Sequence, residues 1–244
     1  MKQGLFEVLK NKRLTDSVYE MTLAGDTSAI TAPGQFVNIR LDGFYLRRPI
    51  SVCDCEEGKL TIVYKTVGRG TEYLAAAKTG DKFDVLTGLG NGYDLALSGS
   101  SVLLIGGGVG VPPLYLLAKR LISEGKSVKV ILGFNTSSEV FYEEEFKALG
   151  ASVTVTTADG TKGVKGFVTA AMDCDCSYFY TCGPEPMLKA VYAASKTSGQ
   201  FSFEERMGCG FGACMGCSCK TVTGYKRICK DGPVLRKEEI LWQA

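Results

Sequence analysis

The sequence predicts a multidomain protein of the α/β plus β class. We expect an antiparallel β-barrel at residues 1–97, a parallel α/β-sheet domain at 98–200 and a small C-terminal unit at 201–244. Three observations support this division. Short runs with alternating apolar residues fill the first stretch, strands and helices alternate after "SGSS" at 98–101, and five of the ten cysteines gather near the end.

The barrel is expected because several runs are rich in β-branched and aromatic residues and are separated by Gly, Asp and Pro turns. These expected strands cover residues 34–41, 49–55, 59–65 and 82–86. "TEYLAAAK" at 71–78 predicts one short helix, because strong helix formers follow Gly68 and Gly70.

The sheet domain begins with "VLLIGGG" at 102–108, which is typical of a fully buried strand that runs into a glycine turn. Pro112 and Pro113 follow where the first turn of a helix tolerates proline. Further helices are expected at 114–123, 143–149 and 187–195, and further strands at 128–134, 152–158 and 177–183. This alternation predicts βαβ units and a parallel sheet.

The C-terminal unit contains "CKTVTGYKRIC" at 219–229, which predicts a β-hairpin that turns at Thr223–Gly224. A unit of about forty residues seldom buries enough apolar surface to fold unaided. A metal site would therefore help to stabilise it.

Composition excludes several classes of function. The net charge is +2, and 28 basic residues are interspersed with 26 acidic ones, so no basic stripe for nucleic acid is present. The start, "MKQGLFEVLKNKRL", has no apolar signal region, and no run approaches the roughly 18 apolar residues of a spanning helix, so we expect a cytoplasmic protein. With no histidine, the commonest general acid/base is missing, and any metal must be held mainly by sulfur.

The spacing of Cys209, Cys214 and Cys217 is C-x4-C-x2-C, which is the plant-type ferredoxin pattern for a [2Fe-2S] cluster. Two residues compete for the fourth ligand position. Cys229 is favoured because the hairpin would return it close to Cys217, whereas Cys219 would need a tight contortion. A four-cysteine structural zinc site is the alternative, although such sites more often use two C-x2-C pairs. Disulfides are disfavoured in a reducing compartment.

"RRPIS" at 47–51 lies at the mouth of an expected barrel strand, where Arg48 and the Ser51 hydroxyl suit a pyrophosphate. "GRGT" at 68–71 precedes the expected helix, where backbone N–H groups and the helix dipole favour an anion. Together the two segments suggest a flavin-dinucleotide site. The alternatives are a solvated arginine pair and a turn with a helix cap.

"GGGVGVPP" at 106–113 stands where a dinucleotide phosphate loop would, although its spacing differs from G-x-G-x-x-G. A glycine turn that closes against the sheet is the alternative. "CGPEPM" at 182–187 follows a later strand, at the edge where open α/β sheets bind ligands; Cys182 either approaches a nicotinamide or is a buried small hydrophobe. "NTSSEV" at 135–140 has no arginine for a 2′-phosphate, which favours NAD over NADP.

Barrel, sheet domain and cysteine motif in this order resemble the ferredoxin-reductase superfamily. More narrowly, the chain resembles the electron-transfer subunit of type B (NAD-dependent) dihydroorotate dehydrogenase over nearly its whole length. The segments that carry this resemblance are "RRPIS", "GGGVGVPPL", "VFYEEEF", "TCGPEPMLKA", "EERMGCGFGAC" and "CKDGPV". One departure from the wider superfamily is Ile50, where many ferredoxin reductases have an aromatic residue that stacks on the flavin.

The resemblance implies FAD on the barrel, NAD on the sheet domain and a [2Fe-2S] cluster in the C-terminal unit. The implied FAD contacts are Arg48, Pro49, Ile50, Ser51, Val63, Tyr64, Lys65, Gly70 and Thr71. The NAD residues are Gly107, Gly108, Gly110, Cys182, Gly183 and Pro184. The cluster ligands are Cys209, Cys214, Cys217 and Cys229.

The resemblance also implies an oxidoreductase subunit of pyrimidine biosynthesis with no catalytic residue of its own. Dihydroorotate would be oxidised on a separate FMN-bearing catalytic subunit, in a heterotetramer of two plus two chains. Electrons would pass from that FMN through the [2Fe-2S] cluster and FAD to NAD. Two alternatives stay open: a flavin and iron-sulfur subunit of another complex, of the ferredoxin:NADP oxidoreductase or sulfide dehydrogenase type, or a zinc-stapled regulatory module without catalysis.

Overall fold

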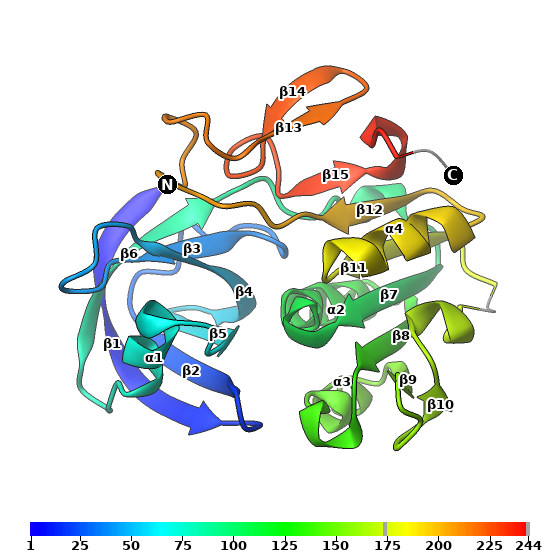
Figure 1. The fold of residues 1–244 in the computed structure, drawn as a ribbon, viewed down its shortest axis with the longest axis horizontal. Coiled ribbons are helices and arrows are strands. Elements are labelled where there is room, and N and C mark those ends of the chain that lie inside the picture. Colours follow the sequence, from blue (N-terminus) through cyan, green and yellow to red (C-terminus); the bar gives the residue numbers. More distant parts are fainter. Residues whose placement is uncertain (173–174, 243–244) are drawn as a thin grey trace.

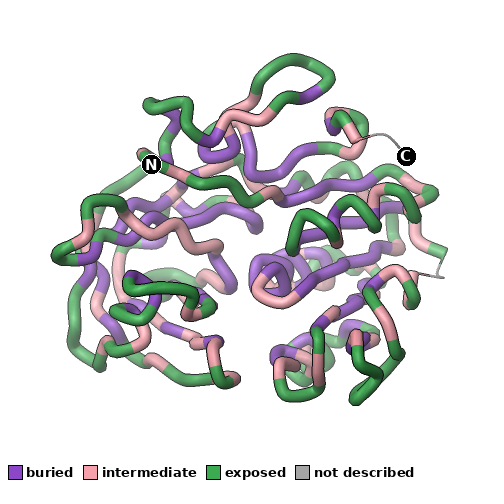
Figure 2. The backbone as a smooth tube through the Cα atoms, in the orientation of Figure 1, coloured by how far each residue is buried: buried purple, intermediate pink, exposed green. Residues whose placement is uncertain are grey.

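The computed structural model describes residues 1–172 and 175–242 of the 244-residue chain. Within these ranges the strands form a closed barrel, a larger open sheet and a small hairpin (Figure 1). Figure 2 shows that the strands of the large sheet are mostly buried, whereas the tip of the hairpin is exposed. The same part of the chain contains no helix that is long and apolar enough to cross a membrane.

Six strands close the barrel in the order β1-β2-β5-β4-β3-β6. Their bounds are β1 Lys2–Arg13, β2 Val18–Ala24, β3 Phe36–Ile39, β4 Arg48–Glu56, β5 Lys59–Lys65 and β6 Lys82–Leu89, and α1 spans Arg69–Ala75. The four expected strands correspond to β3–β6. The sequence pattern does not reveal β1 or β2; in β1 only Phe6 and Val8 are buried, so charged residues on its outer face obscure the alternation.

The large sheet has the order β10-β9-β8-β7-β11-β12-β15, and all neighbouring strands are parallel except the pair β12 and β15. The strands are β7 Ser101–Gly107, β8 Ser127–Phe134, β9 Ser152–Thr157, β10 Val164–Lys165, β11 Tyr178–Cys182, β12 Gly199–Ser202 and β15 Val234–Arg236. The helices are α2 Pro113–Ser123, α3 Glu143–Ala148 and α4 Glu185–Ala194. Short 3-10 helices are η1 Leu95–Leu97, η2 Gly108–Gly110, η3 Ser137–Glu139, η4 Val168–Ala171 and η5 Lys237–Glu239.

The predicted parallel sheet is confirmed, and its register places two predicted motifs side by side. β7 and β11 are parallel neighbours in which Cys182 lies opposite Gly106. The glycine loop after β7 and the "CGP" loop after β11 therefore leave the same edge of the sheet next to each other. This is the carboxyl edge, where open parallel sheets bind ligands.

The cysteine-rich segment is an excursion between two strands of the same sheet. β12 pairs antiparallel with β15, and the chain between them forms the hairpin of β13 Ser218–Thr221 and β14 Gly224–Arg227. The predicted hairpin is confirmed, with its turn at Val222–Thr223, one residue earlier than expected. The boundary at residue 201 stays a prediction, and the structure adds that β12 continues across it.

Barrel and sheet domain are joined by apolar and polar contacts. Cys53 and Val63 of the barrel belong to the same buried cluster as the core residues of the sheet domain. The Tyr142 hydroxyl donates a hydrogen bond to a Glu20 carboxylate oxygen at 2.8 Å and accepts one from the Cys53 thiol at 3.2 Å. These contacts hold the β2 and β4 side of the barrel against the start of α3.

Candidate functional site

A cleft of about 380 Å³ opens where barrel, sheet domain and cysteine-rich segment meet. It brings together, from distant parts of the chain, most of the residues that the FAD prediction names. The predicted residues that line it are Arg48, Pro49, Ile50, Ser51, Val63, Tyr64, Lys65 and Thr71, and Cys182 of the NAD prediction lines it as well. The cleft therefore joins a barrel surface to the carboxyl edge of the sheet.

Arg48 is the first residue of β4, and its guanidinium lies against Gly70 in the first turn of α1. This is a suitable position for an arginine that binds phosphate. Its guanidinium donates to the Leu46 carbonyl at 2.6 Å and stacks over the Phe44 ring at 4.9 Å. A Cβ atom on Gly70 would lie 2.2 Å from Arg48 Nε, so only glycine leaves room for the guanidinium. Gly70 does not line the cleft, but it determines where Arg48 lies.

The Thr71 hydroxyl accepts a hydrogen bond from the Val67 N–H at 2.9 Å and donates one to the Gly68 carbonyl at 3.0 Å. It thereby orders the "GRGT" turn. The helix predicted at 71–78 is observed at Arg69–Ala75, so it both begins and ends earlier than expected. Thr71 lies within its first turn.

Tyr64 is held in place by contacts with Asn11 of β1 and Tyr19 of β2. Its hydroxyl donates to Asn11 Oδ1 at 2.9 Å, its ring stacks on Tyr19, and the residue is 2 % exposed. Burial raises the pKa of the phenol, so it stays protonated at any ordinary pH. Tyr64 therefore presents a rigid neutral wall to the cleft.

The predicted NAD residues converge on one corner of the sheet edge. A Cβ atom on Gly110 would lie 2.3 Å from the Cys182 carbonyl oxygen, and one on Gly107 would lie 2.4 Å from Met187 Sδ and 3.3 Å from Pro184 Cδ. Close packing of the two loops therefore requires Gly110, which faces backbone atoms, whereas Gly107 faces mainly the flexible Met187 side chain. Gly108 differs, since it has a positive φ of 51° and open space around it, which lets a ligand approach its backbone.

Cys182 is 2 % exposed, and burial raises the pKa of its thiol to about 12. It is therefore a neutral thiol and not a nucleophilic thiolate. Cys53 and Cys55, to which the sequence assigns no role, differ from each other: Cys53 is fully buried beside Tyr142, and Cys55 is half-buried. Of the second C-x-C pair, Cys174 lies outside the described residues.

The four predicted cluster cysteines form two pairs of interacting thiols, Cys209 with Cys214 and Cys217 with Cys229. Cys209 Sγ accepts hydrogen bonds from the backbone N–H groups of Ala213 at 3.2 Å and Cys214 at 3.4 Å. Cys217 Sγ accepts one from the Cys229 N–H at 3.4 Å. Backbone donors around sulfur are the environment that iron-sulfur clusters use.

The pKa values of two of these thiols move in opposite directions. Burial would raise the pKa of Cys209, but hydrogen bonds from the backbone of Cys214 and Phe211 outweigh it and lower the pKa to about 6. Burial and the neighbouring Cys217 raise the pKa of Cys229 to about 12. The exposed end of the loop therefore already favours the thiolate that a metal needs, and the buried end would become a thiolate only when a metal binds.

The donor set fits a [2Fe-2S] cluster. Four free thiols are available, and Gly208 and Gly216 lie so close to Cys214 that a Cβ atom would come within 3.2 and 3.6 Å of its sulfur. Among the described residues no three Cys, Asp or Glu side chains converge as ligands of one metal ion do. Paired thiols suit a two-iron cluster, with two cysteines for each iron, better than one tetrahedral zinc ion.

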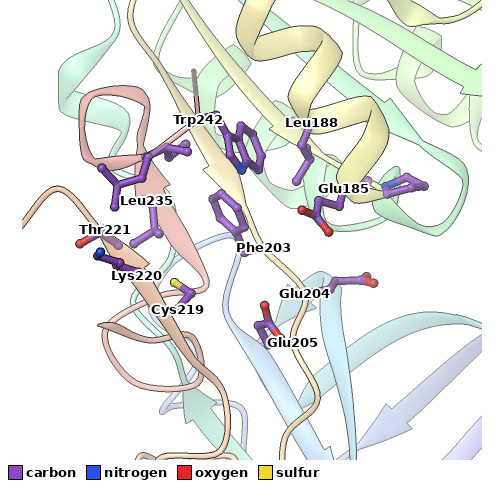
Figure 3. Close-up of a pocket in the computed structure, with 14 residues that line it drawn as sticks. Glu185, Leu188, Phe203, Glu204, Glu205, Cys219, Lys220, Thr221, Leu235 and Trp242 are labelled. Atoms are coloured by element: carbon purple, nitrogen blue, oxygen red, sulfur yellow. The ribbon is translucent and has the colours of Figure 1, made fainter. Parts of the chain in front are cut away.

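The hairpin places Cys229, and not Cys219, against Cys217. Cys219 lies on β13 and lines a second cavity, where Figure 3 shows its sulfur. The cysteine loop is also tied to the barrel, because Asn38 Nδ2 donates to the Cys209 carbonyl at 3.2 Å. The ligand set stays a prediction that this arrangement supports.

Sequence reasoning missed the segment between β12 and the first cysteine. Ser202, Phe203, Glu204, Glu205 and Met207 all line the cleft, although this stretch has no regular secondary structure beyond β12. The position of this segment between a sheet strand and Cys209 is the sequence feature that could have predicted its role. A segment that runs from a sheet strand to a cluster ligand must pass the carboxyl edge of that sheet.

The structure defines a protein of ferredoxin-reductase-like fold, in which a barrel and an α/β sheet border a shared cleft. The fold is similar to that of a ferredoxin reductase of carbazole 1,9a-dioxygenase, with a TM-score of 0.66 and 22% identity over 79% of this chain and 65% of that one. Two family models match, an oxidoreductase NAD-binding domain at residues 104–193 and the iron-sulfur cluster binding domain of dihydroorotate dehydrogenase B at 204–241.

The chain belongs to the family of dihydroorotate dehydrogenase B (NAD(+)) electron transfer subunits. It is 44% identical to that subunit of Bacillus pumilus over 98% of both chains, and 44% identical to that of Fusobacterium nucleatum over 96% of both. It is also similar to a solved structure of an NADH-dependent reduced ferredoxin-NADP oxidoreductase, with a TM-score of 0.89 and 32% identity over 98% of this chain and 90% of the other.

Proposed function

We propose that this chain carries electrons from the FMN of a dihydroorotate-oxidising catalytic subunit, through a [2Fe-2S] cluster and FAD, to NAD. One observation carries the proposal: the segment that leads into Cys209 forms a wall of the cleft that Arg48 and Cys182 also line. The segment that precedes the proposed cluster ligands, the proposed flavin surface and the proposed NAD edge therefore lie next to one another. Relatives named as electron transfer subunits of dihydroorotate dehydrogenase B (NAD(+)) match over 96–98% of their length, which supports the proposal.

The cofactors supply the redox chemistry, and the chain supplies placement and environment. Arg48 and the "GRGT" turn would hold the pyrophosphate of FAD, and Pro49, Ile50, Ser51, Val63, Tyr64 and Lys65 would line its ring system. Ile50 offers only an aliphatic surface there. Tyr64 and Cys182, whose pKa values are raised, would add no charge of their own to the cleft.

NAD would bind over the glycine loop, with Gly107, Gly108 and Gly110 near its phosphates and Cys182, Gly183 and Pro184 near its nicotinamide. Glu139 follows β8 and accepts hydrogen bonds from the Asn135 backbone N–H at 3.1 Å and from Asn135 Nδ2 at 2.9 Å. A carboxylate at this edge repels a 2′-phosphate, which favours NAD over NADP.

The partner we propose is an FMN-containing dihydroorotate dehydrogenase subunit, in a complex of two plus two chains. Dihydroorotate oxidation would occur there, which agrees with the absence of histidine in this chain. The four predicted cluster cysteines are free thiols, which suits a reducing compartment, so we propose that the complex is cytoplasmic.

The test is anaerobic purification of the chain with such a partner. We expect flavin and iron-sulfur absorption, about two irons per chain as the cysteine spacing predicts, and reduction of NAD by dihydroorotate. Zinc in place of iron would favour the regulatory-module alternative. Full cofactor content without NAD reduction from dihydroorotate would contradict the proposal.

A second candidate is the flavin and iron-sulfur subunit of an NADH-dependent ferredoxin:NADP oxidoreductase. It is supported by the TM-score of 0.89 to the solved enzyme of that kind. The same preparation distinguishes the two: NADH oxidation coupled to ferredoxin, with no response to dihydroorotate, would favour the second candidate.

A further inference from the structure

Beside the cleft lies a second cavity of about 370 Å³, between the "CGP" loop, α4 and β13 (Figure 3). Phe203, Leu188 and Trp242 form its apolar side, and Cys219 and Lys220 lie opposite. Glu204 and Glu205 line both this cavity and the cleft. Phe203 lines both as well, so the wall that the cavity and the cleft share is the segment of Phe203 and these two carboxyl residues.

Glu204 differs from an ordinary surface acid. In the described part of the chain it forms no hydrogen bond and no ion pair, and burial alone raises the pKa of its carboxyl. Its charge is felt by Cys182, whose pKa it helps to raise. The residue is nevertheless exposed where it lines the cavity and the cleft, so a proton on it can exchange with water.

The charged and titratable groups around Glu204 come from every element that borders its wall. They are Arg48 on β4, Tyr64 and Lys65 on β5, Cys182 on β11, Glu185 on α4, Cys219 and Lys220 on β13, and the adjacent Glu205. Glu185 is already paired with Lys189 at 2.8 Å. Cys182, with a pKa of about 12, holds its proton too firmly to exchange it near neutral pH.

The proposed function creates a need for a proton at this place, and the inference rests on that function. Conversion of NAD⁺ to NADH takes up two electrons and one proton. The [2Fe-2S] centre delivers electrons singly and brings no proton, and the protons released from dihydroorotate are left on the partner subunit. One proton per NADH must therefore enter this chain from water, and no histidine can transfer it.

We propose that Glu204 is the group that takes this proton from water and donates it into the cofactor cleft. The carboxyl O–H bond breaks as the proton leaves, which gives the carboxylate, and a proton from water in the second cavity restores the acid. During NADH oxidation the same steps run in reverse. A carboxyl whose pKa lies above its ordinary value suits such transfer in both directions.

The experiment uses the holo-complex with Glu204→Gln, Glu204→Asp and Glu185→Gln. Glu204→Gln keeps the shape but carries no exchangeable acid proton, and we expect NADH formation to fall by about 10²-fold, the usual contribution of general acid catalysis. We also expect the rate to lose its dependence on pH and to recover partly with added formate or acetate. Glu204→Asp should keep most of the activity and its pH profile. Glu185→Gln removes a carboxylate from the second cavity only and should leave both unchanged.

A readout that does not depend on turnover is the infrared difference spectrum between oxidised and reduced wild-type complex. We expect a carboxylic acid C=O band that is absent in Glu204→Gln and present in Glu185→Gln. An unchanged band, or Glu204→Gln with wild-type rate and pH profile, would overturn the inference. If the wild-type complex reduces NAD with dihydroorotate in that case, the proposed function stands without it. If Glu204→Gln fails to bind FAD, the wild-type band and the Glu204→Asp profile still decide.

Discussion

The cysteine loop and the cofactor cleft are built in opposite ways. The loop takes its four predicted ligands from residues 209–229 and turns them with positive-φ glycines such as Gly210 and Gly212. The cleft takes its walls from β4, β5, β11 and residues 202–207, so long-range strand pairing assembles it. The cysteine loop can therefore be recognised in the sequence from the spacing of its cysteines. The cleft can be recognised only in the folded structure. Substitutions should also act differently in the two regions. In the loop a substitution removes a ligand of the cluster, and at the cleft it displaces elements that pack against each other.

The largest effect is expected in the loop. Cys229→Ser should remove most of the iron-sulfur absorption and of the bound iron, because Cys229 is held directly against Cys217. Cys219→Ser is the matched control, since its sulfur lies on the second cavity, and its visible spectrum should resemble that of the wild type. If Cys219→Ser loses the cluster and Cys229→Ser keeps it, the hairpin geometry does not select the ligand.

A smaller but specific effect is expected at the sheet edge. Gly110→Ala would place a methyl group 2.3 Å from the Cys182 carbonyl oxygen and force the two loops apart. We expect the KM for NADH to rise at least about tenfold, equivalent to about 1.4 kcal/mol, while iron and flavin content stay constant. Gly58→Ala is a control for a positive-φ glycine with open space far from this edge. Equal KM values in the two variants would contradict close packing as the reason for Gly110.

The smallest effect is expected where barrel and sheet domain are joined. Tyr142→Phe removes the hydroxyl that links Glu20 and Cys53, and the free energy of unfolding should fall by about 1–3 kcal/mol in denaturant titration. Tyr115→Phe is a suitable comparison, because Tyr115 packs edge-on against the same ring and its hydroxyl forms no hydrogen bond within the described residues. A larger loss in Tyr115→Phe would show that packing, not the hydroxyl, joins the two domains.

The difference between the cysteine loop and the cleft also explains which features could be predicted from the sequence. The C-x4-C-x2-C spacing, the hairpin and the buried strand before "GGGVGVPP" depend on nearby residues, and the structure contains these elements. The sequence pattern does not reveal β1 because only Phe6 and Val8 of its 12 residues are buried, and it does not reveal β15 because three residues carry too little pattern. The role of residues 202–207 was missed because the segment carries no motif of its own; its place between a sheet strand and Cys209 was the signal, and the pairing of β15 with β12 fixes where it lies.

The pairing of β15 with β12 also limits how residues 203–233, which carry the proposed cluster ligands, can move. Ser202 and Val234 are direct partners in adjacent strands, so the excursion at residues 203–233 leaves and re-enters the sheet at neighbouring points about 5 Å apart. A lobe with both ends fixed to one sheet edge cannot swing on a tether as a mobile carrier domain does. Electron tunnelling within this chain would then occur over a constant distance, and the catalytic partner must bring its own redox centre to a stationary acceptor.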